Sequence, residues 1–352
     1  MTILDTTIRD GSYAVDFKFT CGDVKQAVSK LSRLGIKYIE IGHGQGLDAS
    51  SPENGISLCS DCEYLDAAKE VVGNSMIGMF CIPGIAHLES LSQAKEHGLS
   101  FIRIGVTVEK VEAAIPFILE AKRVGIIPMV NFMKTYVSTP EALAQSAFRV
   151  WECGAEVVYI VDSAGCMMPE DLKKYIDAVH EKEPELVLGF HGHNNLGMAV
   201  ANSISCVENG VEFIDCSFQG LGRSLGNTPT EMFVMALKKK YPEYDCDIDI
   251  PRLLEYGYVL LKSISPRRDV LNPLDLICGY SGFHSSFLKD IYRCCEEKNV
   301  DPLRLIIAYS SENQKSMDFK RLCEVADGLP RDDFEGHPYS FRQYFTAMYN
   351  DR

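Results

Sequence analysis

The chain has 352 residues, 46% of them apolar, and 35 lysines and arginines against 49 aspartates and glutamates give a formal charge of −14. This composition is that of a soluble globular protein and excludes collagen-like, disordered and disulfide-stapled classes. The negative charge disfavours nucleic-acid binding, and no stretch reaches the roughly 18–20 apolar residues that span a membrane.

A glycine followed within three residues by a short apolar run recurs through the first two thirds of the chain. These glycines are Gly35, Gly98, Gly125, Gly154 and Gly210. A glycine in this position typically ends a helix in the left-handed conformation before the chain enters a strand. Thr139 followed by Pro140 predicts a helix start, with Thr139 as N-cap. The pattern therefore predicts alternating strands and helices.

Eight apolar runs are expected to form strands buried on both faces, as in a parallel sheet. They lie near 3–9, 38–42, 75–81, 101–105, 127–132, 157–161, 186–191 and 213–217. Eight strand–helix units in about 240 residues are typical of a (β/α)8 TIM barrel. A doubly wound sheet is the alternative, but no strand is followed by the glycine-rich dinucleotide motif.

From about residue 241 the pattern predicts helices and no further strands. We therefore expect an α/β protein with two parts. A TIM-barrel catalytic domain covers 1–240, and a C-terminal helical appendage covers 241–352 and contributes to the active site.

The 13 cysteines are odd in number and scattered in apolar contexts, which indicates reduced structural thiols. Residues 1–5 lack the basic and apolar regions of a signal peptide. Together these features predict a cytoplasmic protein.

Polar residues follow several predicted strands, where TIM barrels carry their active sites. His191 and His193 are two apart on an extended segment, so both imidazoles point to one face. With Asp10 from the first strand they suit a catalytic Mn, Zn, Co or Fe(II) ion. The alternative is an incidental pair, with one histidine packed and one solvated. Arg9 either forms an ion pair at the barrel mouth or neutralises a developing oxyanion.

With these residues assembled, the chain resembles the metal-dependent barrel aldolases and lyases, which include isopropylmalate synthase and HMG-CoA lyase. Within that superfamily it is most similar to the 4-hydroxy-2-oxovalerate aldolase family. The likeness extends to about residue 325. It rests on Arg9-Asp10 and on segments 41–51, 83–85, 191–204, 220–231 and 279–288.

The resemblance implies a class II aldolase that cleaves or forms a 4-hydroxy-2-oxo acid, giving pyruvate enolate and an aldehyde. It implies that Asp10, His191 and His193 bind a divalent metal, usually Mn²⁺, with Mg²⁺, Co²⁺ or Zn²⁺ as alternatives. Ser163 would help to hold the substrate carboxylate, and Arg9 would stabilise the enolate.

Two site positions depart from the aldolase pattern. The family has a histidine base three residues after the metal aspartate and a tyrosine in the C-terminal region, and here these positions are Tyr13 and His284. Our hypothesis is that the two side chains exchange places, with His284 as the base and Tyr13 as its hydroxyl partner. The alternative is that each changed separately and the activity changed with them.

Two more residues are candidates for substrate binding. His43 is expected to face the substrate or to lie directly behind it. Arg223 stands where the aldolases have a small residue, and it either meets a carboxylate or phosphate of a different substrate or lies at the surface.

Two other function classes compete with the aldolase. A Claisen-type acyl-CoA lyase or synthase is disfavoured because residues 9–13 lack the glutamate that those enzymes carry after the Arg-Asp pair. A non-catalytic barrel subunit is disfavoured by the intact triad of candidate ligands. The resemblance also leaves open a partnership with an acylating aldehyde dehydrogenase or a homodimer.

Overall fold

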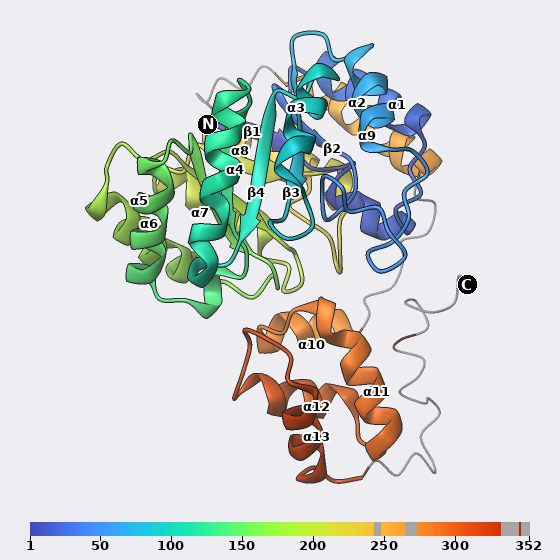
Figure 1. Ribbon diagram of the computed structural model, residues 1–352, viewed down its shortest axis with the longest axis vertical. Helices are drawn as coiled ribbons and strands as arrows, with labels where there is room; N and C mark the ends of the chain where they lie inside the picture. The colour runs from blue at the N-terminus through green and yellow to red at the C-terminus, as the bar shows by residue number, and fades with distance from the viewer. Residues whose placement is uncertain (243–247, 265–272, 332–344, 346–352) are drawn as a thin grey trace.

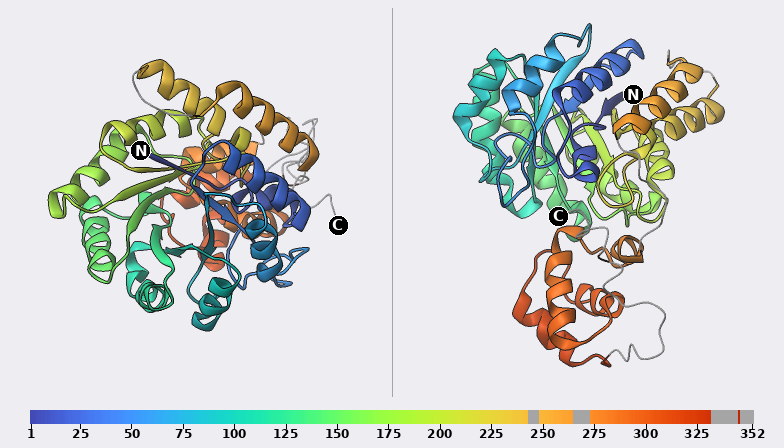
Figure 2. Two further views of the ribbon diagram at one scale, coloured as in Figure 1. Left: turned by 90° about the horizontal axis from the view of Figure 1, so that it is seen from above. Right: turned by 90° about the vertical axis from the view of Figure 1, so that its right-hand side faces the viewer.

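The structure, a computed structural model, describes residues 1–242, 248–264, 273–331 and 345. Eight parallel strands close into a barrel in sequence order, with helices around it (Figures 1 and 2). The strands are β1 (Thr2–Asp5), β2 (Tyr38–Ile41), β3 (Met76–Cys81), β4 (Phe101–Val106), β5 (Ile127–Phe132), β6 (Val157–Asp162), β7 (Leu188–Gly192) and β8 (Phe213–Cys216). The predicted TIM barrel is confirmed.

Helices surround the barrel. They are α1 (Cys21–Arg33), α2 (Asp61–Lys69), α3 (Leu88–Glu96), α4 (Ile115–Arg123), α5 (Pro140–Glu152), α6 (Pro169–Lys182), α7 (Ala199–Glu208) and α8 (Thr230–Lys240). Of these, α1, α3, α4, α5 and α7 each end two residues before one of the predicted glycines. The Thr139 side chain accepts a hydrogen bond from the Ala142 N–H, which confirms it as the N-cap of α5. All five glycines predicted to be left-handed have positive φ.

The first strand is shorter than predicted, which changes where Arg9 and Asp10 lie. β1 ends at Asp5, whose carboxylate accepts hydrogen bonds from the Thr7 N–H at 2.9 Å and the Thr7 hydroxyl at 2.8 Å. This side-chain turn competes with strand pairing. The chain then enters a short 3₁₀ helix, η1 (Asp10–Val15). Arg9 and Asp10 therefore follow the strand instead of forming its end.

Helix α9 (Ile250–Ile264) belongs with the barrel. It packs against α1 and α8, and its Leu253 and Leu260 are buried in the barrel's apolar core. The sequence placed the division of the chain at residue 240, whereas the apolar packing changes between α9 and the next helix. No helix within the described ranges combines the length and apolarity needed to cross a bilayer.

The remaining helices form a bundle with an apolar core of its own. They are α10 (Pro273–Ser281), α11 (Leu288–Lys298), α12 (Pro302–Ser310) and α13 (Phe319–Asp327), and buried Ile291, Leu305 and Leu322 fill the space between them. The bundle lies at one end of the barrel (Figure 2). Ser285 contacts Ser224 after β8 at 3.2 Å, and Lys315 pairs with Glu109 after β4 at 2.9 Å. The bundle therefore covers the carboxyl ends of the strands, where a barrel carries its active site.

Cys21 and Cys59 form a disulfide, so the expectation of reduced thiols is wrong for this pair. Cys21 opens α1, and Cys59 immediately precedes the Ser60 N-cap of α2. The two residues are 38 apart in the chain, and only the fold shows that the starts of these helices are neighbours.

Candidate active site

Three potential metal ligands meet at the carboxyl ends of the strands. Asp10 comes from η1, His191 from β7, and His193 from the position just after β7. Asp10 Oδ2 lies 3.6 Å from His191 Nε2 and 3.9 Å from His193 Nε2. One ligand atom from each residue lies within 4.8 Å of the other two. Since β7, β8 and β1 are adjacent in the closed barrel, the topology brings the three together.

The protonation states of these residues fit a divalent cation. Among the described residues, Asp10 Oδ2 and His193 Nδ1 are buried without a hydrogen-bond partner. Burial raises the pKa of the Asp10 carboxyl, but Arg9 and the two imidazoles outweigh it and hold that pKa well below its usual range. Burial lowers the pKa of His193 to about 4, so its imidazole is neutral near pH 7. A deprotonated carboxylate and a neutral imidazole are the forms that bind metal.

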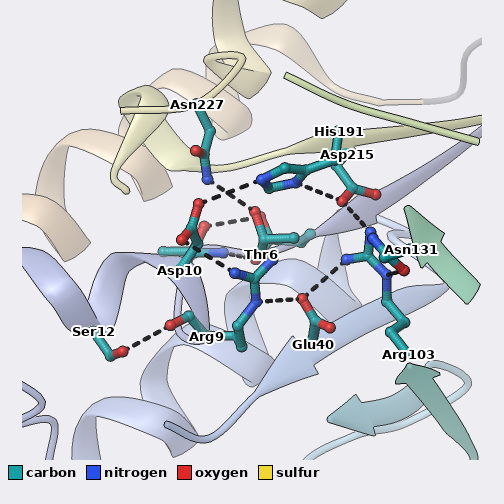
Figure 3. A network of polar contacts seen from close by, with 12 residues as sticks. Thr6, Arg9, Asp10, Ser12, Glu40, Arg103, Asn131, His191, Asp215 and Asn227 are labelled. Atoms are coloured by element: carbon teal, nitrogen blue, oxygen red, sulfur yellow. Dashed lines mark hydrogen bonds and ion pairs between the residues drawn. The ribbon is translucent and has the colours of Figure 1, made fainter. Parts of the chain in front are cut away.

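His191 is held by a carboxylate on its other side. Its Nδ1 lies 2.8 Å from Asp215 Oδ2 (Figure 3). In the neutral tautomer that donates its Nδ1–H to this carboxylate, the lone pair of Nε2 faces Asp10. This carboxylate–histidine pairing is common behind metal-ligating histidines, where it fixes the tautomer.

Asp215 belongs to a buried ring of alternating charges (Figure 3). Arg103 pairs with Asp215 and, at 3.0 Å, with Glu40, and Glu40 accepts from Arg9 Nε at 2.7 Å. Arg9 pairs with Asp10 at 3.1 Å, and His191, which contacts both Asp10 and Asp215, closes the ring. Two guanidiniums thus face three carboxylates, which leaves one excess negative charge inside the barrel. A buried net charge is costly, and a cation at the triad would compensate it.

A cavity of about 310 Å³ opens beside the triad and contains most of the predicted site residues. Its lining includes Arg9, Asp10, Tyr13, Ser163, His191, His193, Arg223 and His284. Tyr13 comes from η1, Arg223 from the loop after β8, and His284 from the turn before η5 (Ser285–Phe287) in the bundle. Residues of the barrel and of the bundle thus line one cavity.

His43 is the exception, because it does not line this cavity. Its ring stacks on Phe17 with centroids 4.1 Å apart, and its Nδ1 accepts from the Gln45 N–H at 3.0 Å. Burial lowers the pKa of His43 to about 4. Gly44 and Gln45 line the cavity in its place, so His43 supports the loop that carries them.

The sequence analysis missed the interior of the charge ring. Glu40, Arg103 and Asp215 are each the single charged residue of their strand. Asn131 is likewise the single polar residue of β5. Each is buried, and Arg103 is 0% exposed. A lone charge in a strand buried on both faces needs a buried partner, and that is the signal that identifies these residues.

Comparison with known proteins places the chain in a family. The HMGL-like family model matches residues 1–259. The oxaloacetate decarboxylase of Mycobacterium tuberculosis is 35% identical over 304 residues, covering 86% of this chain and 89% of that protein. The 4-hydroxy-2-oxovalerate aldolase of Moorella thermoacetica is 35% identical over 305 residues, covering 87% of this chain and 89% of that protein. That of Geobacillus genomosp. 3 is 34% identical over 327 residues, covering 93% and 96%.

Solved structures of other proteins share the fold of this chain. The carboxyl transferase domain of Rhizobium etli pyruvate carboxylase superposes with a TM-score of 0.74 at 16% identity, covering 96% of this chain and 62% of that one. The HMG-CoA lyase of Brucella melitensis superposes with a TM-score of 0.63 at 19% identity, covering 76% and 99%. By its family match and by relatives that align along most of its length, the chain belongs to the HMGL-like family.

Proposed function

We propose that this chain is a class II aldolase that cleaves or forms a 4-hydroxy-2-oxo acid, with pyruvate and an aldehyde as the products of cleavage. The observation that carries the proposal is one cavity that joins the triad Asp10, His191 and His193 to Arg9 and His284. Relatives named 4-hydroxy-2-oxovalerate aldolase, 34–35% identical to this chain, support it.

The triad is the proposed metal site, with Mn²⁺ as the ion. Two imidazoles and one carboxylate with open positions suit Mn²⁺ as well as other first-row metals. When bound, such an ion supplies a Lewis acid for the substrate's keto oxygen. Ser163 Oγ accepts the Lys134 backbone N–H at 3.0 Å, which leaves its own proton free to hydrogen-bond the substrate carboxylate.

His284 is the proposed general base. Cleavage breaks the C3–C4 bond, and the C4 hydroxyl must lose its proton as the bond breaks. Ser286 Oγ lies 2.7 Å from His284 Nδ1, and the Ser286 N–H also points at Nδ1 at 3.3 Å. Nε2 would take the proton in the tautomer whose Nδ1–H is donated to Ser286 Oγ. Burial, reinforced by the positive charges of Arg223 and Lys134, lowers the pKa of His284 well below its ordinary value. The imidazole is therefore neutral and able to accept a proton at pH 7.

Tyr13 and Arg9 complete the proposed machinery. Burial raises the pKa of the Tyr13 phenol, so it remains protonated and can donate a hydrogen bond to the C4 oxygen. Arg9 is held by Glu40 and Asp10 with its guanidinium at the cavity wall. A fixed cation in this position stabilises negative charge as it develops on the enolate without having to reorganise.

Decarboxylation of a 2-oxo acid that carries a carboxylate on C3 is the second candidate. The relative from Mycobacterium tuberculosis named oxaloacetate decarboxylase, 35% identical to this chain, favours it. Loss of CO₂ also leaves an enolate for Arg9 to stabilise, but it removes no hydroxyl proton. His284 is therefore needed for aldol cleavage and not for decarboxylation.

Replacing His284 with Gln distinguishes the two activities. Because removal of a general base typically costs 10²–10⁴-fold, pyruvate release from 4-hydroxy-2-oxovalerate should fall at least about 100-fold. Oxaloacetate decarboxylation should change by less than about fivefold. His87→Gln is the control, since His87 is exposed and does not line the cavity. Near-normal cleavage by His284→Gln would contradict the assignment of the base.

The remaining predictions are unchanged by the comparisons. The Claisen-type enzyme and the non-catalytic subunit have no better support than the aldolase among the named relatives. An acylating aldehyde dehydrogenase partner, a homodimer and a cytoplasmic location stay predictions.

A further inference from the structure

Two cations in the cavity lack the carboxylate partners that such groups usually have. Arg223 and Lys134 both line it, and no carboxylate within the described ranges forms an ion pair with either. The guanidinium carbon of Arg223 lies 5.1 Å from the centroid of the Tyr13 ring. Lys134 Nζ lies 4.6 Å from the centroid of the Phe287 ring and 3.4 Å from the carbonyl oxygen of Lys315. These partners are uncharged, so within the part of the chain that the structure describes both positive charges remain uncompensated.

Arg9, which lines the same cavity, differs from these two cations because carboxylates neutralise its charge. It pairs with Glu40 at 2.7 Å and with Asp10 at 3.1 Å. Among the charged side chains that line the cavity, Arg9, Lys134 and Arg223 are cationic and Asp10 alone is anionic. Since Arg9 already engages Asp10, the positive charge of the other two is available to a ligand.

Holding these cations together is unfavourable in the absence of an anion. Burial lowers the pKa of Lys134, and the positive charge of Arg223 lowers it further. Lys134 has φ 58°, and Ser224, next to Arg223, has φ 56°. The left-handed conformation is unfavourable for a residue other than glycine. Repelling charges on strained backbone are features that collect at binding sites, where the ligand repays the cost.

The position of the two cations relative to His284 indicates which part of the substrate they meet. Both lie close enough to His284 to influence its charge state. If His284 takes the proton of the C4 hydroxyl, then groups around it face C4 and the atoms beyond. Those atoms leave as the aldehyde, whereas in the proposed function the 2-oxo carboxylate would lie at the triad.

We propose that Arg223 and Lys134 bind a second anionic group, a carboxylate or a phosphate, on the aldehyde half of the substrate. The inference rests on the proposed aldolase function and narrows its substrate class. In cleavage the C3–C4 bond breaks, the C4 hydroxyl gives its proton to His284 and becomes a carbonyl, and C3 of the enolate is protonated to give pyruvate. The anionic group stays on the aldehyde, so no further reactant is needed.

Binding of stable analogues tests the inference without turnover. The Mn²⁺-loaded protein is titrated calorimetrically with 2-oxopentanedioate and with 2-oxopentanoate, which lack the C4 hydroxyl and differ only in a carboxylate or methyl at C5. A third analogue, 2-oxo-4-phosphonobutanoate, distinguishes a phosphate site from a carboxylate site. We expect one of the two dianionic analogues to bind at least about tenfold more tightly than 2-oxopentanoate, as a charge-assisted hydrogen bond provides.

Matched variants test whether Arg223 and Lys134 cause the preference for the dianionic analogue. Arg223→Gln and Lys134→Met should each reduce the ratio of its affinity to that of 2-oxopentanoate at least about fivefold. Arg149→Gln should leave it unchanged, because Arg149 pairs with Glu112 at the surface at 3.0 Å. Equal binding of the dianionic analogues and monoanionic 2-oxopentanoate by the unmodified protein would overturn this inference but not the proposed function. Failure to bind any of the three would contradict the proposed function and the inference with it.

Discussion

Asp215 shows how a buried carboxylate can serve a metal site that it does not touch. It accepts the Nδ1–H of His191 at 2.8 Å and pairs with Arg103, and both it and Arg103 have fully buried side chains. It therefore fixes the tautomer of one candidate ligand and contributes one of the three negative charges of the ring. The two roles have different consequences when the residue is changed.

Asp215→Asn removes the charge while keeping the shape. We expect the affinity for Mn²⁺ to fall 10–100-fold, the usual effect of losing such an outer partner of a ligating histidine. The free energy of unfolding should fall by about 3–5 kcal/mol, because Arg103 loses one of its buried carboxylates. Calorimetric titration and denaturant unfolding measure the two effects.

Asp177→Asn is the matched control, since Asp177 pairs with Lys173 on the exposed face of α6. Exposed pairs contribute at most about 1 kcal/mol. Unchanged Mn²⁺ affinity in Asp215→Asn would show that Asp215 does not orient His191.

The environment of His284 predicts the pH dependence of cleavage. A base works in its deprotonated form, and burial together with Arg223 and Lys134 lowers the pKa of His284 well below its ordinary value. At saturating Mn²⁺, kcat/KM for pyruvate release should therefore stay constant from pH 8 down to about 6.5, the ordinary histidine value. Lys134→Met removes one of the two charges and should shift any acid limb to higher pH. An acid limb centred at or above pH 6.5 in the unmodified enzyme would be inconsistent with a neutral His284.

At the scale of elements, the site depends on a close approach between the loop after β6 and the end of β7. Gly165 has φ +62°, and a Cβ added there would lie 2.5 Å from Asn195 N and 2.8 Å from His193 O. Both are backbone atoms of the segment that carries the second histidine, so they cannot move without moving His193. Gly125 also has positive φ, but a Cβ there would meet nothing within 4 Å.

Gly165→Ala and Gly125→Ala therefore separate backbone strain from displacement of a ligand. Each should lower the free energy of unfolding by roughly 1–2 kcal/mol, the cost of a left-handed alanine. Gly165→Ala should in addition weaken Mn²⁺ binding about tenfold or more, whereas Gly125→Ala should not change it. Equal Mn²⁺ affinities in the two variants would show that this contact does not position His193.

The strand–helix order could be predicted because the relevant signals are local. Thr139, Pro140 and the recurring glycines mark helix ends, and apolar runs mark the strands. The end of β1 could not be predicted, because the Asp5–Thr7 hydrogen bonds that stop it look in the sequence like any polar strand end. The packing of α9 on the barrel was also missed, since a helix carries no local sign of which core it joins.

The candidate site could be predicted where residues lie at strand ends and could not where they depend on pairing across the barrel. His191 and His193 were recognised from their spacing at the end of β7, and Asp10 from its place after the first strand. Lys134 follows β5 with no motif around it, and its relation to Arg223 exists only in three dimensions. His284 was identified through resemblance, because no local pattern ties a turn in the bundle to the barrel.

At the scale of the whole molecule, a cation should stabilise the fold because the buried charge ring carries an excess negative charge. At 100 times its Kd, Mn²⁺ would add about 2.7 kcal/mol to the free energy of unfolding. For a barrel of this size that corresponds to a rise in Tm on the order of 5 °C. Differential scanning fluorimetry with and without Mn²⁺ measures it, and Asp10→Asn should lose most of the rise. A Tm that does not respond to Mn²⁺ would be evidence against a metal at the triad.

Pyruvate release from 4-hydroxy-2-oxovalerate by chelator-treated enzyme, followed as Mn²⁺ is added back, tests the central claim most directly. The unmodified enzyme should be inactive after chelation and regain activity with one equivalent of Mn²⁺. The Asp10→Asn variant should regain at most about 1% of that activity, as expected when a ligand of a catalytic metal is lost. Full activity in the presence of the chelator, or full recovery by Asp10→Asn, would contradict a metal-dependent aldolase centred on Asp10, His191 and His193.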